Sequence, residues 1–302
     1  MFSYWIPITI FAAFMQNLRS ALQKYIKGRL STGGAAYVRF LYALPLALIY
    51  LWAVRHYGGY ELPQVNGLFL LYCILGGLTQ IIFTFILIYL FSLRNFAVAT
   101  TFSKTEILQI AVLGLILLGD NISPLGMAAI VVGMTGVVVL SMAQSAVTWS
   151  NLATSLFEKS TLVGLVCGAF LGASVVFVRG ATLALGDLDV MIRASFTLAV
   201  VLTIQTVLMG VYLLWREPGQ MMLVFRHWKP AAGVGLAGFL GSVGWFTAFT
   251  LQNAAYVRAV GQIELIFTFI ASIVFFKEKT SPMELGGIAL ILVAIVAIIL
   301  TG

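Results

Sequence analysis

Two carboxylates and two cations lie within long apolar stretches of this chain. Glu106 follows Lys104 by two residues in "SKTEIL", and Glu264 of "GQIEL" follows Arg258 by six. A charge at the centre of a membrane helix costs about 2.5–3.5 kcal/mol on insertion scales, so such residues pair, reach water or line a wet cavity. There the carboxylates can bind a proton or a cationic group, and the cations can hold a carboxylate or phosphate.

Two interpretations of the carboxylates stay open, and they are compatible because an ion pair can break during transport. In one, Glu106 and Glu264 face a central cavity and bind substrate or proton. In the other they are structural, with Glu106 bridging to Arg39 and Glu264 to Arg193. The two arginines have their own alternatives, which are anchoring or gating near a membrane interface and direct substrate contact.

The spacing of Lys104 and Glu106 restricts the local structure. On a regular helix these residues are about 200° apart and cannot share a face. Either one of them points away from the cavity centre, or the helix start is irregular there. An alternative for Lys104 and Arg258 is that each lies early in its helix and reaches water.

Neutral polar and aromatic residues within the apolar stretches add candidates for substrate contact. Gln109 shares a helical face with Glu106, three residues earlier. Interhelical hydrogen bonding is the alternative for the amides, and a lipid-facing or interfacial position is the alternative for the aromatics. The candidates are Gln109, Gln262, Asn17, Trp245 and Tyr89.

The composition is that of a polytopic membrane protein. Of 302 residues, 61% are apolar and 9% are charged, whereas soluble domains carry about 25% charge. The net charge of +7 comes from basic residues dispersed over short connections, so no nucleic-acid partner is expected. The two cysteines lie in apolar runs, and no cluster of metal-ligand spacing occurs, so neither metal nor cofactor is expected.

Ten membrane-spanning helices are predicted, because each apolar run approaches the roughly 20 residues that a span needs. The longest connection, residues 144–160, separates a first set of five helices (1–143) from a second (161–302). The predicted spans are 2–22, 33–54, 67–91, 95–118, 123–143, 161–183, 189–214, 231–251, 255–276 and 281–300.

The two halves repeat each other at a shift of 158 residues. Glu106 then meets Glu264, and the Ser-Pro pair at 123–124 meets the pair at 281–282, whereas Lys104 meets Gln262 and Arg258 meets Thr100. Because five is odd, the second half inserts inverted, as in transporters that work by alternating access around a midplane site. The unmatched cations are where specificity is expected.

These features resemble the drug/metabolite transporter superfamily, in its ten-helix EamA-type branch, over essentially the whole chain. The resemblance rests on Asn17 in "FMQN", on Arg39 in "VRFLYALP", on Arg193 in "MIRASF" and on the acidic loop residues Asp120 and Glu278. The Trp of the family's first motif is missing. The family's frequent fourth-helix proline would fall at Glu106 and Glu264, so a carboxylate replaces it in both halves.

The function expected is secondary transport of a small polar metabolite, such as an amino acid or similar amphoteric molecule, by alternating access. Charges of both signs suit a zwitterion, and proton coupling through Glu106 or Glu264 stays open. The alternative is an organic cation carrier using the two carboxylates as counter-charges. A channel and a membrane-embedded enzyme are remote alternatives, because neither a filter motif nor HExxH, GxSxG or a Walker loop is present.

Loop charges predict the orientation. The connections after odd-numbered spans hold most of the basic residues, so the positive-inside rule places them in the cytoplasm and both termini outside. The family resemblance more often implies both termini inside. We expect a monomer in a bacterial inner membrane.

Overall fold

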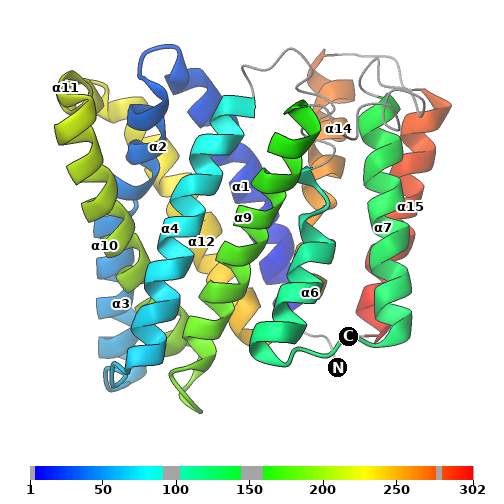
Figure 1. Ribbon diagram of the computed structural model, residues 1–302, viewed down its shortest axis with the longest axis horizontal. Helices are drawn as coiled ribbons and strands as arrows, with labels where there is room; N and C mark the ends of the chain where they lie inside the picture. Colours follow the sequence, from blue (N-terminus) through cyan, green and yellow to red (C-terminus); the bar gives the residue numbers. More distant parts are fainter. Residues whose placement is uncertain (1–3, 91–102, 144–158, 277–280, 302) are drawn as a thin grey trace. The chain divides into compact units, whose positions relative to one another are not determined.

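A computed structural model describes residues 4–90, 103–143, 159–276 and 281–301, and the regular elements within these ranges are helices (Figure 1). The helices are α1 (Trp5–Lys27), α2 (Thr32–Leu41), α3 (Leu44–Gly58), α4 (Gly67–Leu90), α6 (Glu106–Leu118), α7 (Pro124–Ala143), α9 (Lys159–Leu183), α10 (Val190–Arg216), α11 (Pro218–Arg226), α12 (Trp228–Leu251), α13 (Ala254–Gly261), α14 (Ile263–Phe276) and α15 (Pro282–Thr301).

Seven candidate membrane spans occur in the described residues, which makes this a multi-pass membrane protein. They cover 32–58, 67–90, 124–143, 161–183, 190–216, 228–251 and 282–300, and Glu106–Leu118 is a shorter apolar helix. Helices also lie at the predicted first, fourth and ninth spans, although residues 91–102 fall outside the described ranges. The total of ten spans and the inverted repeat stay predictions.

Three predicted spans contain an interruption or begin irregularly. Residues 42–43 separate α2 from α3, which carries a proline in its first turn. Lys104 and Thr105 form a turn before α6, and Gln262 forms a turn between α13 and α14. The interruptions before α6 and α14 occupy equivalent positions at the shift of 158, so Glu106 and Glu264 both lie in the first turn of a helix.

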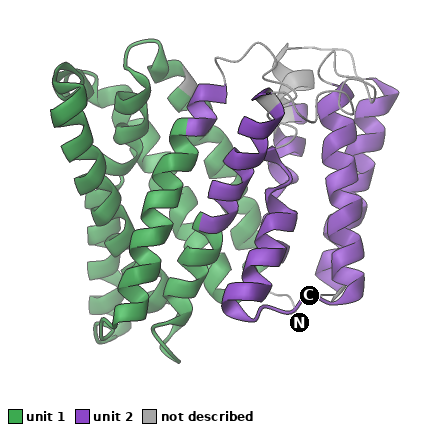
Figure 2. Ribbon diagram, in the orientation of Figure 1, with its two compact units in different colours: residues 1–85, 174–252 green, residues 86–173, 253–302 purple. Residues whose placement is uncertain are grey.

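The chain divides into two compact units (Figure 2). Unit 1 comprises residues 1–85 and 174–252, and unit 2 comprises residues 86–173 and 253–302. Unit 1 draws one segment from each of the predicted halves, whereas the segment 86–173 of unit 2 runs from the first half into the second. The boundaries fall inside α4, inside α9 and between α12 and α13. The division into halves at residues 144–160 stays a prediction, because residues 144–158 lie outside the described ranges.

In unit 1, α1 packs along α12, and α10 packs against α2, α3 and α12. Glycines allow the first contact, since a β-carbon at Gly244 would lie only 2.8 Å from that of Ala12. The segment predicted as a polar connection after residue 214 instead contains α11. Proline in its first turn favours the helix start, and the side chain of Gln220 accepts a hydrogen bond from the Ser31 backbone at 2.9 Å.

In unit 2, α7 packs along α15, and α13 packs against α6. The two repeated Ser-Pro sites begin α7 and α15. Ser123 accepts from the Gly126 backbone at 3.0 Å, while Ser281 and Glu284 form a reciprocal capping box at 3.2 and 2.7 Å. The repeat noted in the sequence thus corresponds to the same local structure at two helix starts.

Candidate functional site

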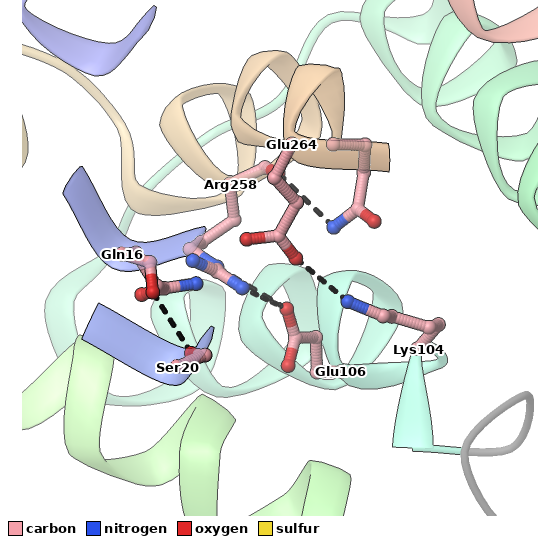
Figure 3. Close-up of polar contacts among 7 residues, drawn as sticks. Gln16, Ser20, Lys104, Glu106, Arg258 and Glu264 are labelled. Carbon is pink, nitrogen blue, oxygen red and sulfur yellow. Dashed lines mark hydrogen bonds and ion pairs between the residues drawn. The ribbon is translucent and has the colours of Figure 1, made fainter. Parts of the chain in front are cut away.

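Among the described residues of unit 2, the more buried of two ion pairs joins Glu106 at the start of α6 to Arg258 on α13 (Figure 3). Arg258 donates from Nε to Glu106 Oε1 at 3.2 Å and also from Nη2 to the same oxygen. Both side chains are only 3% exposed. The expectation that Arg258 reaches water is therefore wrong; its charge is balanced within the protein.

The second ion pair joins Lys104, in the turn before α6, to Glu264 near the start of α14 (Figure 3). The distance from Lys104 Nζ to Glu264 Oε1 is 2.7 Å. The side chains are 24% and 13% exposed, respectively, so this pair is more accessible than the first. Together the two pairs form a four-residue cluster with no net charge, which we call the charge cluster.

Local backbone structure explains how these four side chains meet. Lys104 and Thr105 form a turn before α6, so the regular helix that would set Lys104 and Glu106 about 200° apart begins only at Glu106. This confirms the irregular helix start expected from their spacing. Glu106 and Glu264 also lie at helix N-termini, where the helix dipole stabilises negative charge.

The pairing crosses the two predicted halves. Glu106 takes its cation from the second half and Glu264 takes its cation from the first, although the two cations are not counterparts in the repeat. The alternative pairing of Glu106 with Arg39 and of Glu264 with Arg193 is therefore wrong. Both arginines lie in segments of unit 1, whereas both carboxylates belong to unit 2.

Arg39 and Arg193 occupy different environments within unit 1. Arg39, at the end of α2, is buried and donates to Thr84 Oγ1 on α4 at 3.4 Å. Arg193 is half-buried in the first turn of α10 and donates to the Gly186 carbonyl at 3.1 Å. A backbone contact across the start of its own helix fits anchoring for Arg193, and gating by either arginine stays a prediction.

Two glutamines carry unused acceptors in unit 2. Gln109 Nε2 donates to Thr105 Oγ1 at 3.1 Å, and Gln262 Nε2 donates to the Arg258 carbonyl at 3.4 Å. Neither Oε1 atom has a hydrogen-bond partner among the residues that the structure describes, although both are buried. Thr105 lies next to Glu106 in the chain, and Arg258 belongs to the charge cluster. The side-chain carbonyl oxygens of Gln109 and Gln262 are therefore available acceptors beside the cluster.

The remaining predicted candidates, Trp245, Asn17 and Tyr89, occupy different environments. Trp245 is buried in unit 1 and stacks on Phe249, with ring centroids 5.6 Å apart. Asn17 is half-buried on α1 in the same unit. Tyr89, on the part of α4 that belongs to unit 2, is 43% exposed, which suits the lipid-facing or interfacial alternative.

One polar contact was not expected from the sequence. Arg179, which the sequence marks only as a loop charge, donates to the carbonyls of Phe249 and Gln252 at 2.6 and 2.7 Å and holds the end of α12. Gln205 donates to Gln80 at 2.6 Å, which is the interhelical hydrogen bonding that the sequence offers as the alternative role of amides within the spans. Within the described ranges no group of three His, Cys, Asp or Glu residues could hold a metal ion.

Comparisons with known proteins bear on the fold and the family. Residues 159–300 match the model of the EamA-like transporter family. No curated protein matches the chain significantly in sequence, whereas 28 chains of solved structures match significantly in fold. One of these, the crystal structure of a protein 14% identical to this chain, covers 98% of it over 96% of its own length with a TM-score of 0.68.

At 14% identity the structural likeness concerns the fold alone. The match to the family model, by contrast, rests on the amino-acid sequence. It lies over helices of the second half, in a protein with several helices long enough to cross a membrane. Residues 159–300 of this multi-pass membrane protein are thus similar in sequence to the EamA-like transporter family, which belongs to the drug/metabolite transporter superfamily.

Proposed function

We propose that the chain is a secondary transporter that carries a small zwitterionic metabolite, such as an amino acid, by alternating access. In this proposal ten spans form two inverted five-helix repeats. The observation that carries the substrate class is the charge cluster, in which two carboxylates at helix starts beside chain interruptions pair with two cations in a membrane protein. Interrupted helices are frequent substrate sites in transporters.

The two pairs have different roles in this proposal. The Glu106–Arg258 pair is nearly inaccessible and fixes α6 against α13. The Lys104–Glu264 pair is the more exposed one and therefore the one that substrate can open. A zwitterion supplies a carboxylate for Lys104 and an ammonium for Glu264, so each protein charge exchanges one partner for another.

Charge balance favours a zwitterion over the organic cation that the carboxylates alone suggested. A cation without an acidic group would satisfy Glu264 and leave the ammonium of Lys104 with its main partner displaced. Uncompensated charge within a membrane is expensive, so such a substrate would bind less well. The unused Oε1 atoms of Gln109 and Gln262 are further acceptors for the substrate's ammonium group.

Binding to the purified chain tests the substrate class. Thermal unfolding is followed with a panel of amino acids and with two analogues of each, one lacking the carboxylate and one lacking the amine. We expect stabilisation by a zwitterion and a much weaker response to both analogues. Equal stabilisation by the amine alone would favour the organic cation carrier and contradict the proposal.

Counterflow in proteoliposomes tests the transport mode. A carrier preloaded with unlabelled substrate accumulates labelled substrate transiently, and its rate saturates, whereas a channel shows neither behaviour. Imposing a pH gradient in the same vesicles tests proton coupling through Glu106 or Glu264. A non-transporting protein that turned the substrate over chemically would instead support the enzyme alternative, which the match of residues 159–300 to a transporter family disfavours.

A further inference from the structure

A surface pocket of about 340 Å³ lies at the end of α3, in unit 1. It is lined by Trp52, Arg55, His56, Gly59 and Tyr60. Pockets that hold small ligands begin at about 300 Å³, so this one is large enough for a lipid headgroup or a metabolite of similar size. None of its residues belongs to the charge cluster, and the proposed transport function makes no use of them.

The chain folds back at this helix end and closes one side of the pocket. Gly59, with φ of 68°, ends α3 in the left-handed conformation that glycine adopts readily. A β-carbon at Gly58 would collide with the Tyr60 ring, so Tyr60 lies directly against the last turn. Tyr60 also hydrogen-bonds to Asp189, the N-cap of α10, whose carboxylate accepts from the Met191 backbone at 2.8 Å. The fold therefore fixes this wall.

Aromatic rings support the pocket on the helix itself. Trp52 and His56 stack with their ring centroids 5.3 Å apart and an interplanar angle of 6°. Tyr57 packs edge-on against both, at 6.1 Å from Trp52 and 5.1 Å from His56. All three residues are exposed. Exposed tryptophan and tyrosine near the end of a membrane helix are typical of the interface between acyl chains and headgroups.

Arg55 is the cation of this pocket that has no partner in the protein. Its side chain is exposed, and within the described ranges it forms neither a hydrogen bond nor an ion pair. A positive charge in the last turn of a helix offsets the helix dipole, but that role leaves the five guanidinium donors unused. The positive-inside rule does not explain Arg55 either, because the connections after the other even-numbered predicted spans hold no lysine or arginine.

An exposed apolar face of α3 leads to the pocket. Leu48, Ile49 and Trp52 are exposed and share a helical face with Arg55. The candidate span ends at Gly58, so at 1.5 Å per residue Trp52 lies about 9 Å and Arg55 about 4–5 Å before its end. A headgroup layer is about 5–7 Å deep. Apolar side chains at acyl-chain depth thus lead to a free guanidinium at headgroup depth.

We propose that the pocket at the end of α3 binds the phosphate headgroup of an anionic phospholipid. The Arg55 guanidinium can bind two phosphate oxygens at once, and a ring N–H of His56 can donate to a third. The exposed face of Leu48, Ile49 and Trp52 then contacts an acyl chain, which a soluble phosphate lacks. All of these residues belong to unit 1, and the site does not depend on the zwitterion proposal.

Thermal unfolding of the purified full chain in a neutral detergent tests this site. Phosphatidylglycerol is the probe, and phosphatidylcholine, which carries no net charge, is added to a parallel sample at the same mole fraction. We expect phosphatidylglycerol to raise the melting temperature saturably, on the order of 5 °C at concentrations well above its Kd, and phosphatidylcholine to do much less. An equal response to the two lipids would overturn the proposal.

Variants assign the effect to Arg55. Arg55→Gln should raise the phosphatidylglycerol concentration needed for half-maximal stabilisation roughly tenfold, and Arg55→Lys should raise it less. Because Arg55 is exposed and has no protein partner, these variants should fold. The matched control is Arg216→Gln, since Arg216 also ends a candidate span beside an exposed tryptophan but does not line the pocket. An unchanged response in Arg55→Gln, or the same loss in Arg216→Gln, would overturn the assignment.

A soluble phosphate is the other source of the same chemistry. Glycerol 3-phosphate, which has a phosphate group but no acyl chain, is titrated in place of the lipid at constant ionic strength. Stabilisation as strong as that by phosphatidylglycerol at equal concentration would contradict a lipid site. Arg55→Gln should leave stabilisation by amino acids unchanged, so failure of this site and failure of the zwitterion proposal give different results.

Discussion

Glu106 and Arg258 bond to each other with both side chains only 3% exposed, across 152 residues of sequence. The neighbouring pair, Lys104 with Glu264, is several times more exposed. In the proposed function, this difference in exposure distinguishes a structural pair from a pair that substrate can open.

Breaking the buried pair should destabilise the protein. Glu106→Gln leaves the Arg258 guanidinium buried without its counter-charge, a change that costs about 3–5 kcal/mol in other proteins. We expect a clear fall in the melting temperature of the purified protein. Glu264→Gln, which disturbs the more exposed pair, should cost less.

The double variant Glu106→Gln/Arg258→Gln provides the control for this first prediction. It removes both charges, so it should recover part of the stability that the single variant loses. If Glu106→Gln and Glu264→Gln destabilised the protein equally, the distinction between the two pairs would be wrong.

Close packing of α7 on α15 can be tested with two adjacent glycines. A β-carbon at Gly287 would lie 2.8 Å from the Leu140 backbone nitrogen and 2.9 Å from the Gly136 carbonyl oxygen, whereas one at Gly286 meets nothing within 4 Å. Gly287→Ala should therefore destabilise unit 2 by about 1–3 kcal/mol through overpacking. Thermal unfolding measures the effect, and Gly286→Ala is the matched control, expected to be near neutral.

Orientation follows from the loop charges. Basic residues concentrate in the connections after odd-numbered predicted spans, so the positive-inside rule places Gly302 outside the cytoplasm. An alkaline phosphatase fusion at the C-terminus should be active, and a green fluorescent protein fusion should be dark. The opposite pair of results would support the arrangement that the family resemblance more often implies.

Sequence reasoning located most of the fold because the apolar runs are long and the connections are short and polar. Helices lie at each predicted span within the described residues, with boundaries usually within a few positions. It missed α11, because "PGQMMLVFR" is too short and too polar to read as a span. It also gave no specific position for the interruption between α2 and α3, where two turn residues precede a helix with proline in its first turn.

For the site, the sequence identified the charged residues but not their partners. Repeat symmetry singled out Glu106 and Glu264 and marked Lys104 and Arg258 as unmatched. It suggested symmetric pairs with Arg39 and Arg193, whereas the observed pairs cross between the halves. Spacing within one helix cannot reveal such pairs, because they depend on the packing of α6 against α13 and on turns that redirect the side chains.

The central claim is that Lys104 recognises the carboxylate of a zwitterionic substrate. Its most direct test combines Lys104→Gln with a stabilising amino acid and the matching amine that lacks the carboxylate. The wild-type chain should bind the amino acid more tightly than the amine, whereas Lys104→Gln should lose that preference, by roughly tenfold or more for one charge-assisted bond. An exposed-lysine control, Lys229→Gln, should behave as wild type. If Lys104→Gln kept the full preference for the amino acid, Lys104 would not be the carboxylate's partner and the account of the site would fail.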